Sequence, residues 1–211
     1  MREVTFTDPH RRRHFEFFQQ MNHPHFSICA NVSIGDFRSH AARKGLLLTP
    51  LLVYWIARTA NDIRNFRWRI RDGRVVEHDQ VHPSFTVTTE VSEVFSFCTV
   101  TYSRSLSTFV RRAQTLMEEM RINPSFSDEP GRDDYLFLSA IPWVSFTGLT
   151  HAMHYHPHDS VPRITWGKFF MQDGNWVMPV SVQAHHALVD GQHVGTFFQH
   201  LEQNTQAYLK T

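Results

Sequence analysis

The sequence has little of what marks several specialised classes of protein. It contains two cysteines in 211 residues, Cys29 and Cys98, which are far apart and form no metal-binding or redox spacing, so we interpret them as buried apolar thiols. Charged residues make up 19% and the net charge is +1 with neutral histidines, so no basic stripe indicates nucleic acid. The longest apolar run, 46–57, is interrupted by Thr49 and Pro50 and is too short to cross a bilayer. No apolar segment follows the charged N-terminus. We therefore expect a cytoplasmic protein that binds neither nucleic acid nor membrane.

The patterning that is present predicts a mixed α and β structure in one domain, 1–211. The 18 phenylalanines indicate a well-filled core and an apolar pocket. Strands and helices occur in runs without strict alternation, which favours an α+β fold over a doubly wound sheet. Asp72-Gly73 and Asp173-Gly174 predict hairpin turns. Cap signals and apolar spacing predict the following elements: helices over 8–20, 49–65, 106–120 and 194–209, strands near 164–171 and 176–183, and a long loop at 123–131.

The most informative motif lies near the C-terminus, where residues 185–191 read HHALVDG. Imidazole is the side chain whose ordinary pKa, about 6.5, lets it take and return a proton near neutral pH. The preceding stretch alternates like a strand, so the histidines are expected where a strand ends and a loop begins, a common position for catalytic residues. Either His185 or His186 is a candidate general base, although a histidine in a chain that has 15 of them is more often only a hydrogen-bonded side chain.

This pattern resembles the HHxxxDG motif of acyl-CoA-dependent acyltransferases. That group includes chloramphenicol acetyltransferases, peptide synthetase condensation domains and, in variant form, dihydrolipoyl acyltransferases. The chain is too short for a condensation domain, and stretches at 11–17, 81–87, 95–96, 139–146 and 183–194 are similar to chloramphenicol acetyltransferases in the same order. The resemblance covers nearly the whole chain. It implies the CoA-dependent acyltransferase fold, an α+β structure in which a two-layer mixed, mostly antiparallel sheet is covered by helices, and a homotrimer with active sites at the subunit interfaces.

The resemblance also implies a role for five residues. His186 matches the general base that takes a proton from an acceptor hydroxyl, whose oxygen attacks the thioester of acetyl-CoA. Ser139 matches the donor of a hydrogen bond to the oxyanion, and Thr165 matches a threonine that positions a water nearby. Asp190 matches a structural aspartate paired with an arginine, which aligns with Arg11 or, with an error of one position, the arginine after it. The transfer is expected to be direct, because the chain has no G-x-S-x-G elbow.

The substrate-binding positions partly depart from the family. Trp143 and Lys168 match residues that contact the coenzyme, whereas Leu47 and Thr49 stand where a lysine and a tyrosine are common. Asn22 and His151 add an amide and an imidazole to an otherwise apolar acceptor wall. Chloramphenicol is the leading acceptor, and because of these polar groups another hydroxyl compound is the alternative. A homologue that binds a ligand or acyl-CoA without turnover is the second alternative. The predicted acceptor pocket consists of Phe17, Phe18, Asn22, Phe26, Phe95, Leu149, His151 and Met153.

A histidine-rich stretch at 151–158 offers an alternative to this interpretation. Its four histidines alternate with other residues and could provide two or three zinc ligands. No carboxylate or cysteine stands at a matching spacing, and Pro157 interrupts any regular element. We therefore expect a loop at the acceptor entrance, and no metal cofactor.

Overall fold

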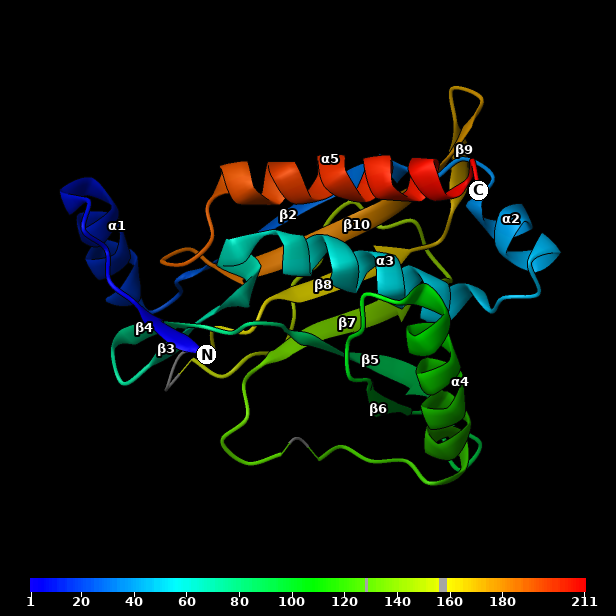
Figure 1. The fold of residues 1–211 in the computed structure, drawn as a ribbon, viewed down its shortest axis with the longest axis horizontal. Helices are drawn as coiled ribbons and strands as arrows, with labels where there is room; N and C mark the ends of the chain where they lie inside the picture. Colours follow the sequence, from blue (N-terminus) through cyan, green and yellow to red (C-terminus); the bar gives the residue numbers. More distant parts are fainter. Residues whose placement is uncertain (128, 156–158) are drawn as a thin grey trace.

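A seven-stranded sheet forms the centre of the computed structural model, which describes residues 1–127, 129–155 and 159–211 (Figure 1). Neighbouring strands pair antiparallel except at β5–β7 and β7–β8, which are parallel. The predicted mixed, mostly antiparallel sheet is therefore confirmed. The strand order is β2 (His25–Ser33), β10 (Asn175–His185), β8 (Arg163–Gly167), β7 (Tyr135–Ile141), β5 (His82–Thr88) and β6 (Phe95–Thr99), and β9 (Phe170–Gln172) pairs with β10.

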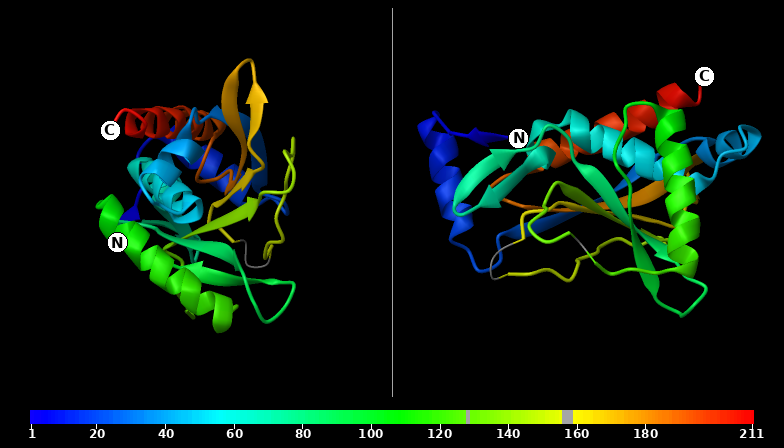
Figure 2. Two further views of the ribbon diagram at one scale, coloured as in Figure 1. Left: turned by 90° about the vertical axis from the view of Figure 1, so that its right-hand side faces the viewer. Right: turned by 60° about the horizontal axis from the view of Figure 1, so that its bottom comes forward.

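Three long helices, α3 (Leu48–Asp62), α4 (Leu106–Ile122) and α5 (Gly191–Tyr208), cover one face of this sheet (Figures 1 and 2). Alternation along β10 explains the two layers, because successive side chains point to opposite faces. Val180 and Val182 belong to the buried apolar core. Ser181 and Gln183 lie on the opposite face, where segment 149–153 contacts them through hydrogen bonds. Along β10 the second face of the sheet is therefore polar and lies under a loop.

A separate small sheet stands beside α1 (Pro9–Gln19); the sequence predicted its hairpin turn at Asp72-Gly73 but not its third strand. Its order is β1 (Arg2–Val4), β4 (Arg74–Glu77) and β3 (Trp68–Arg71), and the 3₁₀ helix η1 (Arg64–Arg67) leads into it. The fully buried Arg69 guanidinium donates hydrogen bonds to the backbone carbonyls of Asp133 and Tyr135. A buried arginine without hydrogen bonds would be very costly, so these contacts fix the small sheet against the start of β7.

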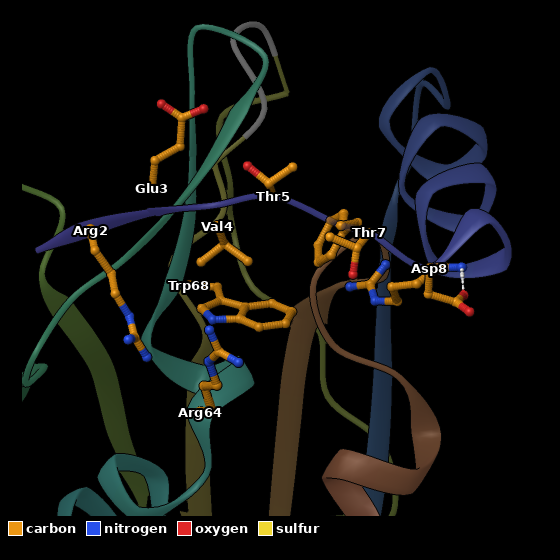
Figure 3. A pocket seen from close by; sticks show the side chains of 10 residues that line it. Arg2, Glu3, Val4, Thr5, Thr7, Asp8, Arg64 and Trp68 are labelled. Atoms are coloured by element: carbon orange, nitrogen blue, oxygen red, sulfur yellow. Dashed lines mark hydrogen bonds between the residues drawn. The ribbon is translucent and has the colours of Figure 1, made fainter.

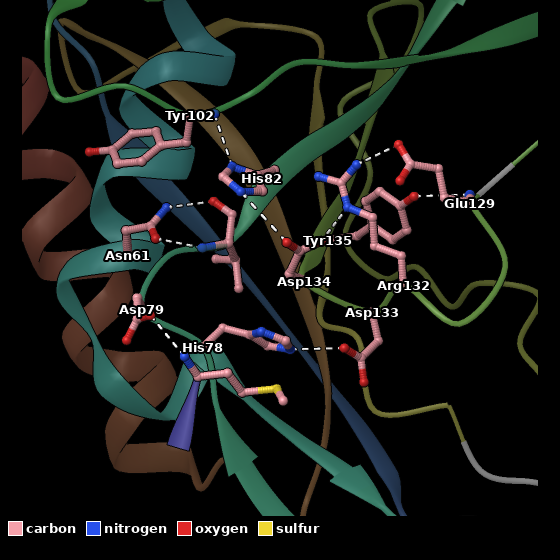
Figure 4. Close-up of polar contacts among 12 residues, drawn as sticks. Asn61, His78, Asp79, His82, Tyr102, Glu129, Arg132, Asp133, Asp134 and Tyr135 are labelled. Carbon is pink, nitrogen blue, oxygen red and sulfur yellow. Dashed lines mark hydrogen bonds and ion pairs between the residues drawn. The ribbon is translucent and has the colours of Figure 1, made fainter. Parts of the chain in front are cut away.

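Polar contacts at the base of β5 and β7 reinforce this attachment (Figure 4). The carboxylate of Asp133 pairs with Arg71 at 2.5 Å and with His78 Nε2 at 2.8 Å. Burial alone would raise the pKa of Asp133, but the bonds from Arg71 and His78 hold it well below its usual range. On the next strand, His82 Nδ1 accepts the Tyr102 backbone N–H at 3.0 Å.

The predicted helices are all present, with shifted ends. Asp8 caps α1 as expected, its carboxylate accepting the Arg11 backbone N–H at 2.7 Å. Leu47, rather than Thr49, is the residue before α3, because a proline is accommodated anywhere in the first turn of a helix. The short α2 (Phe37–Arg43) was not predicted from the sequence. None of the helices in the described ranges is long and apolar enough to span a membrane.

The predicted strand 164–171 is wrong as a single element, since it is divided into β8 and β9. The break follows Gly167, where a Cβ atom would lie 2.8 Å from Pro179 and 2.9 Å from the Val144 carbonyl oxygen. Segment 142–145 crosses close to β8 there, and the Lys168 N–H donates to that carbonyl at 3.0 Å. Glycine therefore permits the close approach that ends the strand.

Candidate active site

The loop between β10 and α5 carries the HHALVDG motif and presents only one of its histidines. His185 is the last residue of β10 and is 1% exposed, and its Nδ1 accepts the Ala187 N–H at 3.2 Å. His186 follows at the strand end and is partly exposed. Its backbone N–H donates to the Pro24 carbonyl at 2.8 Å. The structure thus buries the first imidazole and leaves the second accessible.

The His186 ring is held in a defined position and tautomer. Its Nδ1 lies 3.2 Å from the Val189 carbonyl oxygen. Because a carbonyl can only accept a hydrogen bond, Nδ1 carries the proton, and Nε2 of the neutral ring keeps its lone pair. Phe18 stacks on the imidazole with centroids 4.0 Å apart and planes inclined by 24°, and Phe26 lies at 4.4 Å. The side chain that could accept a proton is therefore oriented before any substrate binds.

Arg11 binds the backbone of this loop. Its Nη2 donates to the Ala187 carbonyl at 2.7 Å and to the Leu188 carbonyl at 3.3 Å. The guanidinium lies over the Phe6 ring at 4.3 Å, beside a pocket that Trp68 also lines (Figure 3). Burial lowers the pKa of Arg11, and the charge of Asp190 opposes that effect. The arginine remains protonated in any case, so the loop is fixed by a charged donor.

The expected ion pair between Arg11 and Asp190 is wrong in this chain. Arg11 and Arg12 are the two candidate partners, and neither has a nitrogen within 4.0 Å of an Asp190 carboxylate oxygen. Asp190 is instead the N-cap of α5: its Oδ1 accepts the Gly191 N–H at 2.6 Å, and His193 Nδ1 accepts the Asp190 N–H at 2.9 Å. An N-cap aspartate faces the helix amides, so the charge of Asp190 acts on Arg11 without a direct ion pair.

One group of possible metal ligands involves the same loop. Ligand atoms of His14, His186 and Asp190 lie within 4.8 Å of one another. However, His14 Nδ1 is 3.2 Å from Arg11 Nη1, and burial and then the Arg11 charge lower the pKa of His14. A guanidinium at this distance repels a second cation. These side chains therefore fit a proton acceptor better than a metal site.

Ser139 lies elsewhere, in a pocket of about 580 Å³ on the face of the large sheet opposite the long helices. The serine is in β7, and its Oγ is 3.4 Å from Thr86 Oγ1 on β5. Phe95, Phe97 and Phe137 form an aromatic wall of the pocket, which His151 and Met153 close from the loop side. The pocket therefore combines an apolar wall with a hydroxyl donor.

Thr165 lies directly across from Ser139 in the parallel register of β7 and β8. It is fully buried, and its Oγ1 is 3.0 Å from His151 Nε2. Burial, and then the charge of Arg163, lower the pKa of His151 to about 4. At neutral pH the pocket therefore contains an uncharged imidazole.

The predicted acceptor residues fall into two separate groups in one chain. The first surrounds His186: Phe18 and Phe26 touch its ring, Phe17 is 61% exposed beside Phe18, and Asn22 is exposed before β2. The second surrounds Ser139 and consists of Phe95, His151 and Met153, with Leu149 bonded through its carbonyl to Ser27. His154 also lines this pocket, and residues 156–158 of the histidine-rich stretch lie outside the described residues.

The distance between the two groups follows from the sheet register. Ser139 pairs with Thr165, which pairs with Ser181, and His186 lies five residues beyond Ser181. Two strand spacings and five residues of extended chain separate Ser139 from His186 by about 15–20 Å. One substrate hydroxyl cannot contact both side chains of the same chain.

The two predicted coenzyme residues lie near each other at the C-terminal ends of β7 and β8. Trp143 is 76% exposed and Lys168 is also exposed. The Lys168 N–H bonds to the Val144 carbonyl, and the Ser145 hydroxyl donates to the Lys168 carbonyl at 2.8 Å. An exposed ring and an ammonium group at one strand edge are suited to an aromatic base and a phosphate.

Sequence reasoning missed two groups that shape these sites. Asn65 donates through Nδ2 to the Leu188 carbonyl at 3.0 Å, and Gln183 accepts the His151 N–H at 2.8 Å. Both side chains act on backbone groups that are distant in the sequence. No local sequence pattern predicts such contacts, because any polar residue at the same position in space could make them.

Comparison with known proteins agrees with this architecture. A family model described as chloramphenicol acetyltransferase matches residues 1–202. Chloramphenicol acetyltransferase 2 of Haemophilus influenzae is 31% identical over 201 residues, which cover 95% of this chain and 94% of the relative. A chloramphenicol acetyltransferase of Clostridium perfringens is 31% identical over 219 residues, covering 98% and 96%. A solved chloramphenicol acetyltransferase superposes with a TM-score of 0.85 at 26% identity, covering 96% of this chain and 98% of that structure. The cubic core of the pyruvate dehydrogenase multienzyme complex, at 18% identity and a TM-score of 0.69, shares the fold.

Proposed function

Because the chain belongs to the chloramphenicol acetyltransferase family, we propose that this acyltransferase moves an acetyl group from acetyl-CoA to a hydroxyl of chloramphenicol, with His186 as the general base. The observation that carries the proposal is the contact between His186 Nδ1 and the Val189 carbonyl oxygen, from which the tautomer follows. The Nδ1–H of His186 is occupied by the Val189 carbonyl at 3.2 Å, which leaves the Nε2 lone pair for a substrate proton.

In the proposed reaction, Nε2 of His186 takes the proton of the acceptor hydroxyl while the oxygen attacks the thioester carbonyl. The tetrahedral oxyanion accepts a hydrogen bond from Ser139, a contribution of about 2.7–4 kcal/mol for a typical donor of this kind. When the intermediate collapses, the sulfur leaves as the CoA thiolate and takes the proton back from Nε2. Proton transfer of this kind accelerates a reaction by about 10²–10⁴-fold.

A complete site in this scheme uses two copies of the chain. His186 and Ser139 of one copy are about 15–20 Å apart along the sheet, so His186 of one copy faces the Ser139 pocket of another, as expected for a homotrimer with sites between subunits. Apolar side chains near both groups support burial between copies: Phe17 is 61% and Phe95 is 43% exposed. The contact is heterologous and closes into a ring.

On the coenzyme side, Trp143 and Lys168 are proposed to bind acetyl-CoA. Leu47, 51% exposed at the start of α3, and Thr49 offer no positive charge there. Lys44 has its ammonium at 3.3 Å from the Thr211 carbonyl, which leaves Lys168 as the better placed cation. Lys168→Ala should therefore raise the KM for acetyl-CoA with little change in kcat.

Release of the CoA thiol, measured with acetyl-CoA and chloramphenicol, tests the proposal. His186→Gln should abolish release while acetyl-CoA binding, measured by calorimetry, stays close to wild type. His200→Gln removes an exposed histidine of α5 and serves as the matched control with normal activity. Retained turnover in His186→Gln would refute the assignment of the base.

The two alternatives give different outcomes in the same assay. Release with another alcohol but none with chloramphenicol would establish the same chemistry on a different acceptor, which the polar groups of the Ser139 pocket favour. No release with a broad panel of alcohols, combined with tight binding of acetyl-CoA, would establish a protein that binds without turnover.

A further inference from the structure

The pocket beside Arg11 has no part in the proposed acetyl transfer. It has a volume of about 290 Å³ and lies between residues 2–8, Arg64 and Trp68 (Figure 3). Arg11 places it near the C-terminal end of β10, whereas the proposed coenzyme residues lie at the C-terminal end of β8. Because β8 and β10 run antiparallel, these are opposite ends of the sheet. The pocket is therefore separate from the proposed coenzyme site.

Guanidinium groups outnumber carboxylates at one end of this pocket. The carboxylate of Glu77 pairs with three of them: Arg2 at 3.2 Å, Arg64 at 2.7 Å and Arg67 at 3.2 Å. Burial alone would raise the pKa of Glu77, but the bond from Arg64 and the charges of the arginines hold it below its ordinary value. The nearby Asp79 carboxylate pairs with the N-terminal ammonium at 2.8 Å. Three guanidiniums on one ionised carboxylate thus leave an excess of two positive charges.

This end of the pocket also has more hydrogen-bond donors than acceptors. Within the described chain, only Nε of Arg64 donates a hydrogen bond, to Glu77 at 2.7 Å, and its two terminal nitrogens have no acceptor. The side chains of Arg64 and Arg2 are 51% and 68% exposed, so a dissolved ligand reaches both. Trp68 Nε1 and Arg67 Nε are buried N–H donors that also have no acceptor in the described ranges. An anion would supply the acceptors that are missing here.

The carboxylates that line the same pocket do not neutralise this end. Glu3 projects from the opposite side of β1 to Arg2 (Figure 3) and pairs with Arg74 at 3.7 Å. Asp8 lies at the other end of the pocket, where it caps α1. The Arg2–Arg64 end therefore keeps its excess of positive charge.

We propose that this pocket binds a small phosphate monoester, with the phosphate between Arg2 and Arg64 and the organic group against Phe6 and Trp68. A dianionic phosphate matches the excess of two positive charges. Its oxygens accept the paired N–H groups of a guanidinium in a bidentate arrangement. Ligand pockets usually have volumes of about 300–1,000 Å³, so a pocket of about 290 Å³ takes a small ligand.

Calorimetric titration with three probes at one ionic strength and about pH 8 tests the class of ligand. Phenyl phosphate carries about two negative charges and a ring, inorganic phosphate lacks the ring, and benzenesulfonate carries one charge. Phenyl phosphate should bind about tenfold more tightly than either of the others, because burying a ring and a further charged hydrogen bond each contribute about that factor. Equal binding of the three probes overturns the inference.

Substitution of the two exposed arginines tests the location. Arg64→Gln and Arg2→Gln should each weaken phenyl phosphate binding about tenfold, while thermal melts show that both variants fold. Arg74→Gln is the matched control, because Arg74 belongs to the same small sheet but does not line this pocket. Its affinity should stay within about twofold of wild type, since an exposed ion pair contributes little. Wild-type affinity in both Arg64→Gln and Arg2→Gln refutes the site.

The coenzyme site is the other place where a phosphate is expected to bind. Phenyl phosphate should bind equally well to Lys168→Ala and to the wild-type protein saturated with acetyl-CoA. If acetyl-CoA or Lys168→Ala removes this binding and Arg64→Gln does not, the probe occupies the coenzyme site and the inference is wrong. These titrations measure binding without turnover, so they decide the phosphate site whether or not the proposed acetyl transfer is found.

Discussion

Replacing Arg11 by alanine should disorder the loop that carries His186, although Arg11 itself is not proposed to contact a substrate. Arg11 donates to the Ala187 and Leu188 carbonyls, both in fully or almost fully buried residues. After the change, the Leu188 carbonyl keeps the amide of Asn65, whereas the Ala187 carbonyl loses its charged donor. Hydrogen bonds to charged groups contribute about 1.5–3 kcal/mol. Since Arg11 is partly exposed, we expect a net loss of about 2 kcal/mol in loop order, which lowers kcat about 30-fold.

The assay separates this loss from a binding defect. Arg11→Ala should lower kcat in thiol release while the KM for acetyl-CoA stays within about twofold of wild type. The change leaves untouched the contacts that bind acetyl-CoA equally in the ground state and the transition state. Arg12→Ala is the matched control: Arg12 bonds the Phe6 carbonyl and is exposed, so its kcat should not change. If Arg12→Ala causes the loss and Arg11→Ala does not, the assignment of the loop contact is wrong.

Substitutions of Asp190 show whether this residue acts as a helix cap or as an ion-pair partner of Arg11. Asparagine caps a helix about as well as aspartate, so Asp190→Asn should leave activity and stability close to wild type. Asp190→Ala should cost about 0.5–2 kcal/mol of stability, measured by urea unfolding. If Asp190→Asn is as damaging as Arg11→Ala, the charge of Asp190 matters more than its position at the cap.

The remaining predictions concern packing and pH. Phe18→Leu removes the ring stacked on His186 at 4.0 Å and should lower kcat about tenfold, an effect that stopped-flow single turnovers would assign to the chemical step; an unchanged rate would show that stacking does not orient the imidazole. Burial lowers the pKa of His151 to about 4, so between about pH 6.5 and 4 the unfolded chain binds a proton that the folded chain does not. The free energy of unfolding should fall by about 2–3 kcal/mol across that interval, and His151→Phe should flatten the profile; an unaltered profile would contradict the assignment. Bonds from Arg71 lower the pKa of Asp133 despite burial, so their stabilisation is present above the usual carboxyl pKa of 3.8 and is lost as the pH falls below it. Asp133→Asn should remove this acid-side loss in thermal melts recorded from pH 5 to 2.

The sequence predicted the elements whose signals are local. Asp8-Pro9 begins α1, Asp173-Gly174 joins β9 to β10, and the spacing over 106–120 is a helix. The small sheet was predicted only in part: Asp72-Gly73 joins β3 to β4, whereas β1 pairs with β4 more than 70 residues away, and Arg69 binds carbonyls more than 60 residues away. Hydrogen bonds between residues that are far apart in one sequence produce no periodic pattern in it.

In the candidate site, too, the sequence predicted what has a local signal and missed what depends on distant contacts. The motif at 185–191 located His186, and similarity to a known family located Ser139. Neither shows that the two lie far apart in one chain, which follows only from the register of β7, β8 and β10. The partner of Arg11 was also wrong, since a motif records which residues are present and not which of two neighbouring groups, a carboxylate or a carbonyl, faces the guanidinium.

The central claim is that His186 of one copy and Ser139 of another act on the same acceptor, and coexpression of two inactive variants tests it most directly. His186→Gln and Ser139→Ala each damage every site when expressed alone. In mixed oligomers, heterologous interfaces combine an intact His186 with an intact Ser139 in roughly a quarter of the sites. We predict thiol release at about that fraction of the wild-type rate. Activity no higher than the mean of the two separate variants would place both residues in one chain's site and contradict the account.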